Sequence, residues 1–390
     1  MDVLVDLTPL DSAVRFRGIG RYVACLGAAL AELVESSDAG PEVVALTALR
    51  AFAPPRLDAT FGWQGAPRFR TYPACHRVYR WRRRLLLDRA AARSGARIWH
   101  QTDPTGTPLR RSVPRVVTCF DLIPLVMHEA YLAPRASALA NQRALDRRRY
   151  ADAARVLAIS PTTKRDLVEQ LGIDPDRIDV TPLGVNHALF HPRLGDSEEA
   201  QLRQALGLRR PFLLYVGGAD ERKNVAHLVR AFARSGIASD VDLVLAGDVH
   251  RTQLPDIRRA IDDGRVTHAA RVLGFVDDAT VAALYRTCLA HACLSLYEGF
   301  GLTVLESLAC GAPTLTTRSG ALADVAAGAA LLVGGVDEDE TVAALRRVVS
   351  DAELRASLSA RGPTQAAGFR WSRCAEATAA SYLRALSALA

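Results

Sequence analysis

The second half of the chain alternates short apolar segments with helix-like stretches, and no other feature constrains the fold as strongly. The apolar segments are FLLYVGG (212–218), VDLVLAGD (241–248), RVLGFV (271–276), HACLSL (291–296) and PTLTT (313–317). Buried parallel strands consist of such nearly continuous apolar runs, and helices connect them. The pattern predicts a doubly wound α/β domain, in which ligands bind at the carboxyl ends of the strands.

The first half shows the same alternation in a less regular form. An apolar strand at 3–7 is followed by a turn at Gly18 and Gly20, and then by a helix-like stretch from Tyr22 to Leu33. Further strand candidates lie at 43–49, 96–100, 115–122 and 155–160. We therefore expect a second α/β domain with a mostly parallel sheet.

A polar segment without strand character, residues 186–210, separates the two halves. A chain of 390 residues is long enough for two packed cores. We predict an N-terminal domain over 1–185, a linker over 186–210 and a C-terminal domain over 211–365. The last segment, 366–390, is predicted to be a helix that packs back toward the N-terminal domain.

Composition excludes several classes of protein. The N-terminus has no basic region before its apolar run, and no uninterrupted apolar run reaches the ~18 residues of a membrane span, so export and membrane insertion are not expected. Seven scattered cysteines without a CxxC pair predict buried reduced thiols rather than disulfides or a zinc site. A net charge of +7 favours anionic partners without distinguishing nucleotides, phosphorylated lipids, acidic polysaccharide and nucleic acid.

The segment YEGFGLTVLE (297–306) places two carboxylates, Glu298 and Glu306, on either side of a glycine-rich bend. A short helix predicted from Leu302 to Cys310 would begin with free amides around Leu302–Val304, which attract phosphate. Glu298 would lie at the rim of this anion site, and Glu306 one turn into the helix. An extended ligand with hydroxyls on both sides of its phosphates, such as a nucleotide sugar, has this layout.

The loop GGADERKN (217–224) supplies two adjacent cations after the first strand of this domain. Arg222 can hold a phosphate with its planar guanidinium group, and Lys223 adds a compact charge, so together they could neutralise a diphosphate leaving group. A solvated basic loop capped by Asn224 is the alternative. Phe275 follows another strand and could border a base-binding slot.

The segment SLYEGFGLTVLESLACGAPTLTT contains Glu298 and, after seven further residues, Glu306. This segment resembles the signature of the retaining glycosyltransferases of family 4, which have the GT-B fold. The segments PLGVNHALF (182–190), ERKN, VLGFV and FRWSRCAEA (369–377) occur in the order of that family, so the resemblance covers nearly the whole chain. It implies an α/β architecture of two Rossmann-like doubly wound domains that face each other across a cleft.

The resemblance also implies a nucleotide-diphosphate sugar bound mainly to the second domain. Glu298 would contact the hydroxyls of the donor sugar, Glu306 those of the ribose, and Arg222 with Lys223 the diphosphate. Configuration would be retained without a protein nucleophile, a metal or another cofactor. The donor-binding residues expected are Gly18, Gly20, Gly218, Phe275, Gly299, Phe300, Gly301, Leu302, Thr303, Val304 and Glu306. Those expected in catalysis are Glu298, Asp121, Arg222 and Lys223.

In the first half, RGIGRY (17–22) resembles the glycine loop of the family, whereas a dinucleotide-binding fingerprint is disfavoured because its glycines follow the first strand about ten residues too late. Phe120 stands at the position that we align with a histidine of many relatives. The adjacent Asp121 could take part of that role or be a structural carboxylate. His100 and Asp103, in WHQTDP, are predicted on the acceptor side, with a core or capping role as the alternative.

The chain departs from the family at two further places. Gly218 stands where relatives tend to have arginine, which puts the orientation of Arg222 in doubt, and Ala323 with Asp324 stands where they show Pro-Glu. Segment 76–97 holds eight arginines against one acidic residue. It could lie on an anionic membrane surface, form an acceptor-binding lid or be a solvated helix face.

The sequence therefore predicts a hexosyltransferase, acting in the cytoplasm or at the inner membrane face. It would move a hexose such as mannose from a GDP- or UDP-type sugar to a saccharide, lipid-linked or natural-product acceptor. A non-catalytic nucleotide-sugar-binding protein is the alternative, because the family histidine and arginine are missing. A nucleic-acid-binding protein that uses segment 76–97 is a third hypothesis, but no RNA- or DNA-binding signature supports it.

Overall fold

The chain folds into two compact units in the computed structural model. Unit 1 comprises residues 1–184 and 371–390, and unit 2 comprises Val185–Arg370. Unit 2 is thus one continuous stretch of chain, whereas unit 1 is completed by the C-terminal segment. The residues that the structure describes are 3–11, 18–35, 91–93, 95–103, 113–132, 135–192, 197–218, 220–247 and 253–389.

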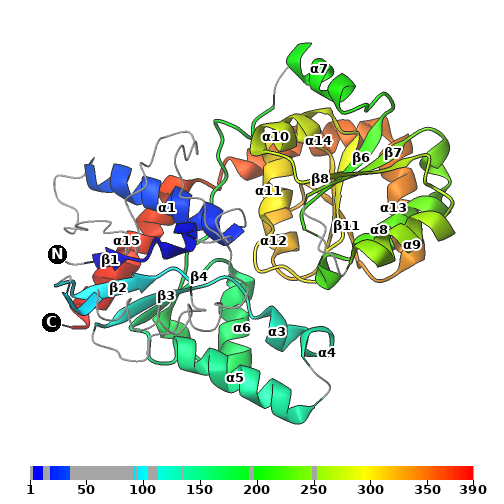
Figure 1. Ribbon diagram of the computed structural model, residues 1–390. Helices are drawn as coiled ribbons and strands as arrows, with labels where there is room; N and C mark the ends of the chain where they lie inside the picture. Colours follow the sequence, from blue (N-terminus) through cyan, green and yellow to red (C-terminus); the bar gives the residue numbers. More distant parts are fainter. Residues whose placement is uncertain are drawn as a thin grey trace. The chain divides into compact units, whose positions relative to one another are not determined.

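A parallel five-stranded sheet forms the centre of unit 1 (Figure 1). Its strands, in sheet order, are β1 (Val3–Val5), β2 (Ile98–Gln101), β3 (Arg115–Cys119), β4 (Arg155–Ala158) and β5 (Ile178–Val180). Four of these follow the predicted apolar runs, whereas β5 was not predicted. The candidate strand at 43–49 lies outside the described residues.

The helices of unit 1 begin and end at recognisable sequence signals. They are α1 (Gly18–Glu35), α3 (Ile123–Val126), α4 (His128–Tyr131), α5 (Ala136–Tyr150), α6 (Pro161–Leu171) and α15 (Trp371–Ser387). In α6, the Ser160 side chain accepts a hydrogen bond from the Thr163 amide (3.0 Å), and Gly172 ends the helix in the left-handed region.

The turn predicted at Gly18 and Gly20 is wrong, because both glycines lie in the first turn of α1. Glycine is unfavourable mainly in helix interiors, so a helix can begin with it. The apolar residues that follow are buried from Tyr22 to Gly27, and their packing against unit 1 holds the helix in place.

Helix α15 is an integral part of unit 1 although it lies at the other end of the chain. It packs along α1. Asp179 of β5 connects it to the sheet, accepting hydrogen bonds from Arg155 of β4 (2.6 and 2.8 Å) and from Ser381 of α15 (2.6 Å). Arg384 of α15 lies 2.9 Å from the same carboxylate.

Unit 2 is a doubly wound domain around a parallel six-stranded sheet. In chain order its strands are β6 (Phe212–Val216), β7 (Asp242–Ala246), β8 (Ala270–Gly274), β9 (Ala290–Cys293), β10 (Thr314–Thr317) and β11 (Leu331–Val333). The sheet order is β11-β10-β9-β6-β7-β8, so the winding direction reverses between β6 and β9. At such a reversal the loops diverge from the strand ends and leave a ligand-sized crevice.

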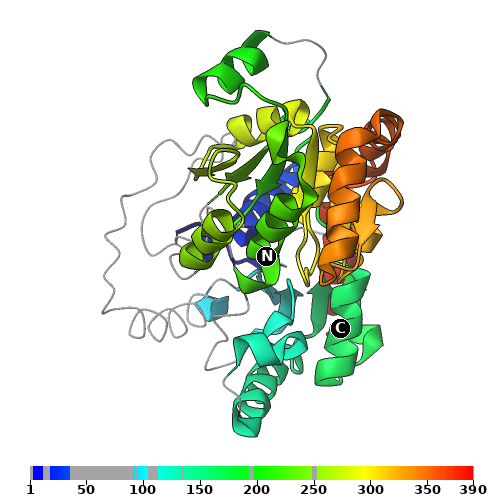
Figure 2. The same ribbon diagram turned by 90° about the vertical axis from the view of Figure 1, so that its right-hand side faces the viewer.

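Helices cover both faces of this sheet. Figure 1 shows α8 (Val225–Ser235), α9 (Leu254–Asp263) and α13 (Glu338–Ser350) on one face. On the other face lie α10 (Asp278–Thr287), α11 (Leu302–Ala309), α12 (Leu322–Ala326) and α14 (Ala352–Ala366). The predicted linker belongs to unit 2. Its helix α7 (Ser197–Ala205), uppermost in Figures 1 and 2, contacts α10, and Arg286 of α10 forms an ion pair with Glu199 of α7.

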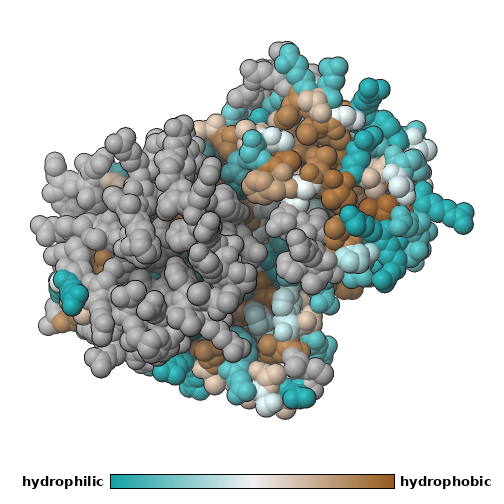
Figure 3. Space-filling model, in the orientation of Figure 1, coloured by the Kyte–Doolittle hydropathy of each residue, from teal (hydrophilic) through white to brown (hydrophobic). Residues whose placement is uncertain are grey.

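The core of unit 2 lies between the sheet and the helix layers. Leu213 and Leu243 of the strands pack with Val229 and Phe232 of α8, and all four are fully buried. Burying a side chain of this kind stabilises a fold by about 1.5–3 kcal/mol. The right-hand surface of unit 2 in Figure 3 is largely hydrophilic, and ion pairs such as Arg234–Glu338 (2.8 Å) connect α8 with α13.

Two expectations from composition can be compared with the structure. Among the described residues, no helix combines the length and the apolar character needed to cross a bilayer. Six of the seven cysteines lie in the described part of the chain, and all six are buried free thiols. The Arg-rich segment 76–97 lies largely outside the described residues.

Candidate active site

The predicted site residues of unit 2 lie in the two loops that leave the sheet at its reversal point. The loop after β6 carries Arg222 and Lys223, and the loop after β9 carries Glu298. These strands are neighbours in the sheet although about 75 residues separate their loops in the sequence. The structure therefore brings together three residues that the sequence assigned to one site.

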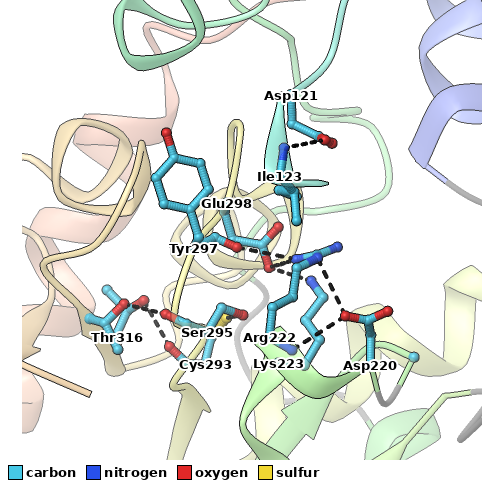
Figure 4. A network of polar contacts seen from close by, with 12 residues as sticks. Asp121, Ile123, Asp220, Arg222, Lys223, Cys293, Ser295, Tyr297, Glu298 and Thr316 are labelled. Carbon is cyan, nitrogen blue, oxygen red and sulfur yellow. Dashed lines mark hydrogen bonds and ion pairs between the residues drawn. The ribbon is translucent and has the colours of Figure 1, made fainter. Parts of the chain in front are cut away.

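Glu298 binds both cations through the same oxygen atom. Its Oε1 accepts a hydrogen bond from Lys223 Nζ at 2.5 Å, and Arg222 Nη1 lies 2.7 Å from it. Figure 4 shows the two cationic side chains converging on this carboxylate. Glu298 is only 8% exposed, so solvent screens these ion pairs less than it would on an open surface.

The environment of Glu298 keeps its carboxyl group ionised. Burial by itself would raise the pKa, but the charges of Lys223 and Arg222 and the hydrogen bonds from Lys223 and Ser295 outweigh it and hold the pKa at about 2. The ion pairs thus contribute stability at any pH above the ordinary carboxyl value, and this contribution is lost only as the pH falls toward 2. A carboxylate with so low a pKa is a weak general base near neutral pH.

Several hydrogen bonds fix the loop that carries the cations. Residues Glu221–Lys223 form a single 3-10 turn, in which Asp220 accepts a hydrogen bond from the Arg222 amide (3.3 Å). The Arg222 carbonyl accepts one from the Leu296 amide (2.7 Å), and Asn224 donates one to the Gly335 carbonyl (2.7 Å). The first of these long-range bonds ties the loop directly to the exit of β9.

Tyr215 holds the beginning of the same loop, a role that the sequence analysis missed. This residue of β6 is buried, and its hydroxyl donates a hydrogen bond to the Gly218 carbonyl at 2.8 Å. Gly218 itself is exposed. The signal in the sequence was a tyrosine inside the otherwise entirely apolar strand FLLYV, since a buried tyrosine hydroxyl usually has a partner.

The bend at Gly299–Gly301 leads into α11, which begins at Leu302 as predicted. Gly301 occupies the N-cap position with φ 104°, and a Cβ there would lie 2.5 Å from Leu322 Cδ2. Only glycine fits at this position without displacing Leu322. Because glycine provides no capping side chain, the first amides of α11, from Leu302 to Val304, are suited to bind an anion.

A turn at residues 319–321 fixes the backbone of Glu298. The Ala321 amide donates to the Glu298 carbonyl at 3.0 Å. Gly320 has φ 61°, and a Cβ on it would lie 2.5 Å from the Glu298 carbonyl oxygen. This glycine was not predicted as a site residue, because its role depends on a contact between segments that are distant in the sequence.

The remaining donor-site candidates of unit 2 differ in exposure. Glu306 lies in the second turn of α11 and is 3% exposed. Phe300 is also buried, and its ring packs edge-on against that of Phe369, with 5.9 Å between the centroids. Phe275, just after β8, is 68% exposed. Phe300 therefore stabilises the bend by packing, whereas the Phe275 ring is open to a ligand.

In unit 1, His100 lies in the core rather than on an open surface. The side chain is fully buried, with Nδ1 2.6 Å from the Tyr382 hydroxyl and Nε2 2.8 Å from Thr118 Oγ1. Burial lowers its pKa to about 3, so the ring is neutral. Because both ring nitrogens have protein partners, the structure favours the core role over the predicted contact with an acceptor.

Asp103 and Asp121 also have local structural surroundings. Asp103 is buried, and its carbonyl accepts a hydrogen bond from Gln101 (3.0 Å). Asp121 is partly exposed and accepts one from the Ile123 amide (3.2 Å) at the start of α3. Phe120, which stands at the family's histidine position, packs edge-on against Tyr22 with 5.1 Å between the ring centroids.

Solved structures show which fold the chain has. Sucrose-phosphate synthase from Thermosynechococcus elongatus superposes with a TM-score of 0.74 over 99% of both chains at 21% identity. HepE (Alr3699) from Anabaena, solved in complex with UDP, gives a TM-score of 0.69 over 100% of both chains at 16% identity. With its two parallel-sheet α/β units, the chain has the GT-B glycosyltransferase fold, as predicted.

Sequence comparison then identifies the family. The model described as "Glycosyltransferase Family 4" matches residues 16–189, and that described as "Glycosyl transferases group 1" matches residues 196–365. The chain belongs to the group 1, family 4-like glycosyltransferases. One relative, the MMP alpha-(1->4)-mannosyltransferase of Mycolicibacterium hassiacum, is 30% identical over 241 residues, which cover 60% of this chain and 55% of the relative. The chain spans about half the length of the curated relatives that it matches.

Proposed function

We propose that the chain is a retaining hexosyltransferase that moves a hexose from a nucleotide-diphosphate sugar to an acceptor hydroxyl. One observation carries this proposal: Arg222, Lys223 and Glu298 converge at the reversal point of the unit 2 sheet. Beside them, the bend at Gly299–Gly301 opens into the N-terminus of α11 without a capping side chain. Cations and amides for a diphosphate, and a carboxylate for hydroxyls, thus occur in one place.

The reaction would depend on stabilising the leaving group. The bond between the sugar C1 and the diphosphate oxygen breaks, the bond between C1 and the acceptor oxygen forms, and the acceptor proton passes to the departing phosphate. Arg222, Lys223 and the first amides of α11 would stabilise the negative charge that develops on the diphosphate. With these groups the proposed reaction needs neither a metal nor a protein nucleophile.

The two glutamates would have separate roles in binding the donor. Glu298 stays ionised because its pKa is about 2, so it would accept hydrogen bonds from the hydroxyls of the sugar instead of removing a proton. Glu306, one turn into α11, would accept hydrogen bonds from the ribose. Phe275, whose ring is exposed after β8, would lie against the base.

The relatives suggest which substrates to test first. The M. hassiacum protein is a mannosyltransferase, which supports mannose as the hexose and a saccharide as the acceptor. HepE was solved in complex with UDP, which supports a uridine diphosphate as the leaving group. We therefore propose a GDP- or UDP-type donor and a glycan, glycolipid or natural-product acceptor, with the reaction in the cytoplasm.

A nucleotide-sugar screen tests this proposal. UDP-, GDP- and dTDP-sugars are added to the purified protein, and both the melting temperature and the release of nucleoside diphosphate are measured. We expect one base to raise the melting temperature, Glu306→Ala to weaken binding of the free nucleotide, and Glu298→Gln to lower turnover more than donor affinity. An NMR assignment of the anomeric configuration of the product tests retention. If no nucleotide sugar stabilises the protein and none is consumed, the proposal is refuted.

A non-catalytic nucleotide-sugar-binding protein is the second candidate. It is favoured by one observation, namely that the packed ring of Phe120 stands where many relatives have histidine. The same screen separates the two functions, because a binding protein would be stabilised by one nucleotide sugar without consuming it. Restoring a histidine with Phe120→His would then be expected to leave turnover undetectable.

A further inference from the structure

The two cations of the site already have an anionic partner within the protein. Lys223 and Arg222 both reach Oε1 of Glu298, and the exposed fractions of the three side chains are 15%, 20% and 11%. Any diphosphate that binds these cations must share them with Glu298 or displace it. The strength of diphosphate binding therefore depends on how firmly the carboxylate is held.

The surrounding segments keep Glu298 beside the cations. Its carbonyl is bound by the Ala321 amide, and Gly320 packs against its backbone so closely that no Cβ fits. From the other side, the Leu296 amide holds the carbonyl of Arg222 at 2.7 Å. Both partners of the ion pair are thus fixed through their backbones, so the carboxylate can return to the same place after each ligand leaves.

We propose that Glu298 also promotes product release, by competing with the free nucleoside diphosphate for Arg222 and Lys223. This inference rests on the proposed function and adds a role to the same site. While the sugar is attached, its hydroxyls hydrogen-bond to Glu298, and the diphosphate shares the cations with the carboxylate. Once the sugar has left, Glu298 has lost the hydrogen bonds from the sugar hydroxyls and takes back both cations.

The charges of the two ligands explain why donor and product are treated differently. In the donor, one phosphate is esterified to the nucleoside and the other to the sugar. Each phosphate therefore carries one negative charge. The product ends in a terminal phosphate, whose second ionisation has a pKa near ~6 and adds most of a further charge at neutral pH. Arg222 and Lys223 attract this added charge as well, and the contribution of Glu298 is a repulsion that is stronger for the product, which has lost the hydroxyl contacts that offset it in the donor.

Removal of the charge on Glu298 tests the inference. In Glu298→Gln, the side chain keeps its size but no longer competes for the cations. We expect the dissociation constants of UDP or GDP and of inorganic pyrophosphate, measured by isothermal titration calorimetry, to fall at least ~10-fold, with a matching fall in the product-inhibition constant. The affinity for the intact nucleotide sugar should not rise in parallel.

Two further variants serve as controls. Glu338→Gln removes another ion-paired glutamate of unit 2, the first residue of α13, and should leave all these affinities unchanged. Glu298→Asp keeps the charge but withdraws it from the cations by one methylene group, so pyrophosphate affinity should lie between those of the wild type and Glu298→Gln. Thermal unfolding of each variant shows whether it is folded, and Glu298→Asp remains informative if Glu298→Gln is not.

The outcomes separate this inference from the proposed function. If the wild type binds nucleotide and pyrophosphate but neither variant at Glu298 binds them more tightly, the release role is wrong and the proposed function stands. If Glu298→Gln binds the product and the intact donor more tightly by the same factor, the proposed discrimination between them is refuted. A wild type that binds no nucleotide and no pyrophosphate would overturn both.

Discussion

Replacement of Gly320 by alanine tests the way in which Glu298 is positioned. Gly320 has φ 61°, and an alanine Cβ there would lie 2.5 Å from the Glu298 carbonyl oxygen and 2.9 Å from its amide nitrogen. Gly328 provides a matched control in the same region of unit 2. It has φ 83°, but a Cβ on it meets no atom within 4 Å. The two substitutions share the backbone strain and differ in the contact with Glu298.

The expected magnitudes follow from these distances. Alanine in the left-handed region costs about 1–2 kcal/mol relative to glycine, and the lower entropy of the unfolded chain offsets part of this. Gly328→Ala should therefore destabilise by about 1 kcal/mol. Gly320→Ala adds the cost of forcing a methyl group against the backbone, about 1–3 kcal/mol. For a unit of this size, the corresponding falls in melting temperature are about 3 °C and about 9 °C.

Thermal unfolding together with a donor-turnover assay would measure both effects. Gly320→Ala should lower turnover at least ~10-fold, because the methyl group displaces the backbone of Glu298 and with it the carboxylate. Gly328→Ala should leave turnover within about twofold of the wild type. Equal losses of stability and of turnover in the two variants would refute the conclusion that the turn at 319–321 positions Glu298.

Three further substitutions test other features of the two units. Ala327 ends α12 with φ 38° and ψ 49°, so Ala327→Gly should relieve strain and raise the melting temperature by about 2 °C, corresponding to about 0.5–1 kcal/mol. Tyr215→Phe removes the hydroxyl that holds Gly218 and should weaken nucleotide binding several-fold in a titration, at a cost in stability of about 1 kcal/mol. Asp179→Asn should destabilise unit 1 at pH 7. Hydrogen bonds and ion pairs hold the pKa of this carboxyl, despite partial burial, below its usual value. The contribution of the Asp179 carboxylate to the free energy of unfolding is therefore complete above the unfolded pKa of about 3.9. The difference in stability between Asp179→Asn and the wild type should vanish as the pH falls through the folded pKa.

Most of the fold could be predicted because buried parallel strands leave a strong signal in the sequence. The run FLLYV, for example, has the composition of a strand buried on both faces, as in a parallel sheet covered by helices, and it forms β6. The strands β5 and β11, of three residues each, were missed because runs this short show no period, whereas the equally short β1 lies within the longer predicted run at 3–7. The start of α1 was misplaced because the glycines of RGIGRY indicate a turn when local preference alone is considered.

The site could be predicted only in part, since partners across the sheet are not encoded locally. The sequence assigned Arg222 and Lys223 to a phosphate, but it could not show that both cations bind Glu298. The sequence placed His100 at the end of a strand, where it was predicted to contact the acceptor. In the structure, Tyr382 of α15, more than 280 residues away, covers its ring. Tyr215 and Gly320 act through contacts that no local pattern reveals.

The division of the chain has a consequence for its synthesis. Unit 2 is one uninterrupted stretch, so it can fold as soon as it has emerged from the ribosome. Unit 1 must wait, because α15 supplies Tyr382 for its core and Ser381 for Asp179. Until that helix arrives, the nascent sheet of unit 1 exposes apolar side chains that α15 later covers. A chaperone that binds nascent chains would therefore be expected to recognise unit 1 rather than unit 2.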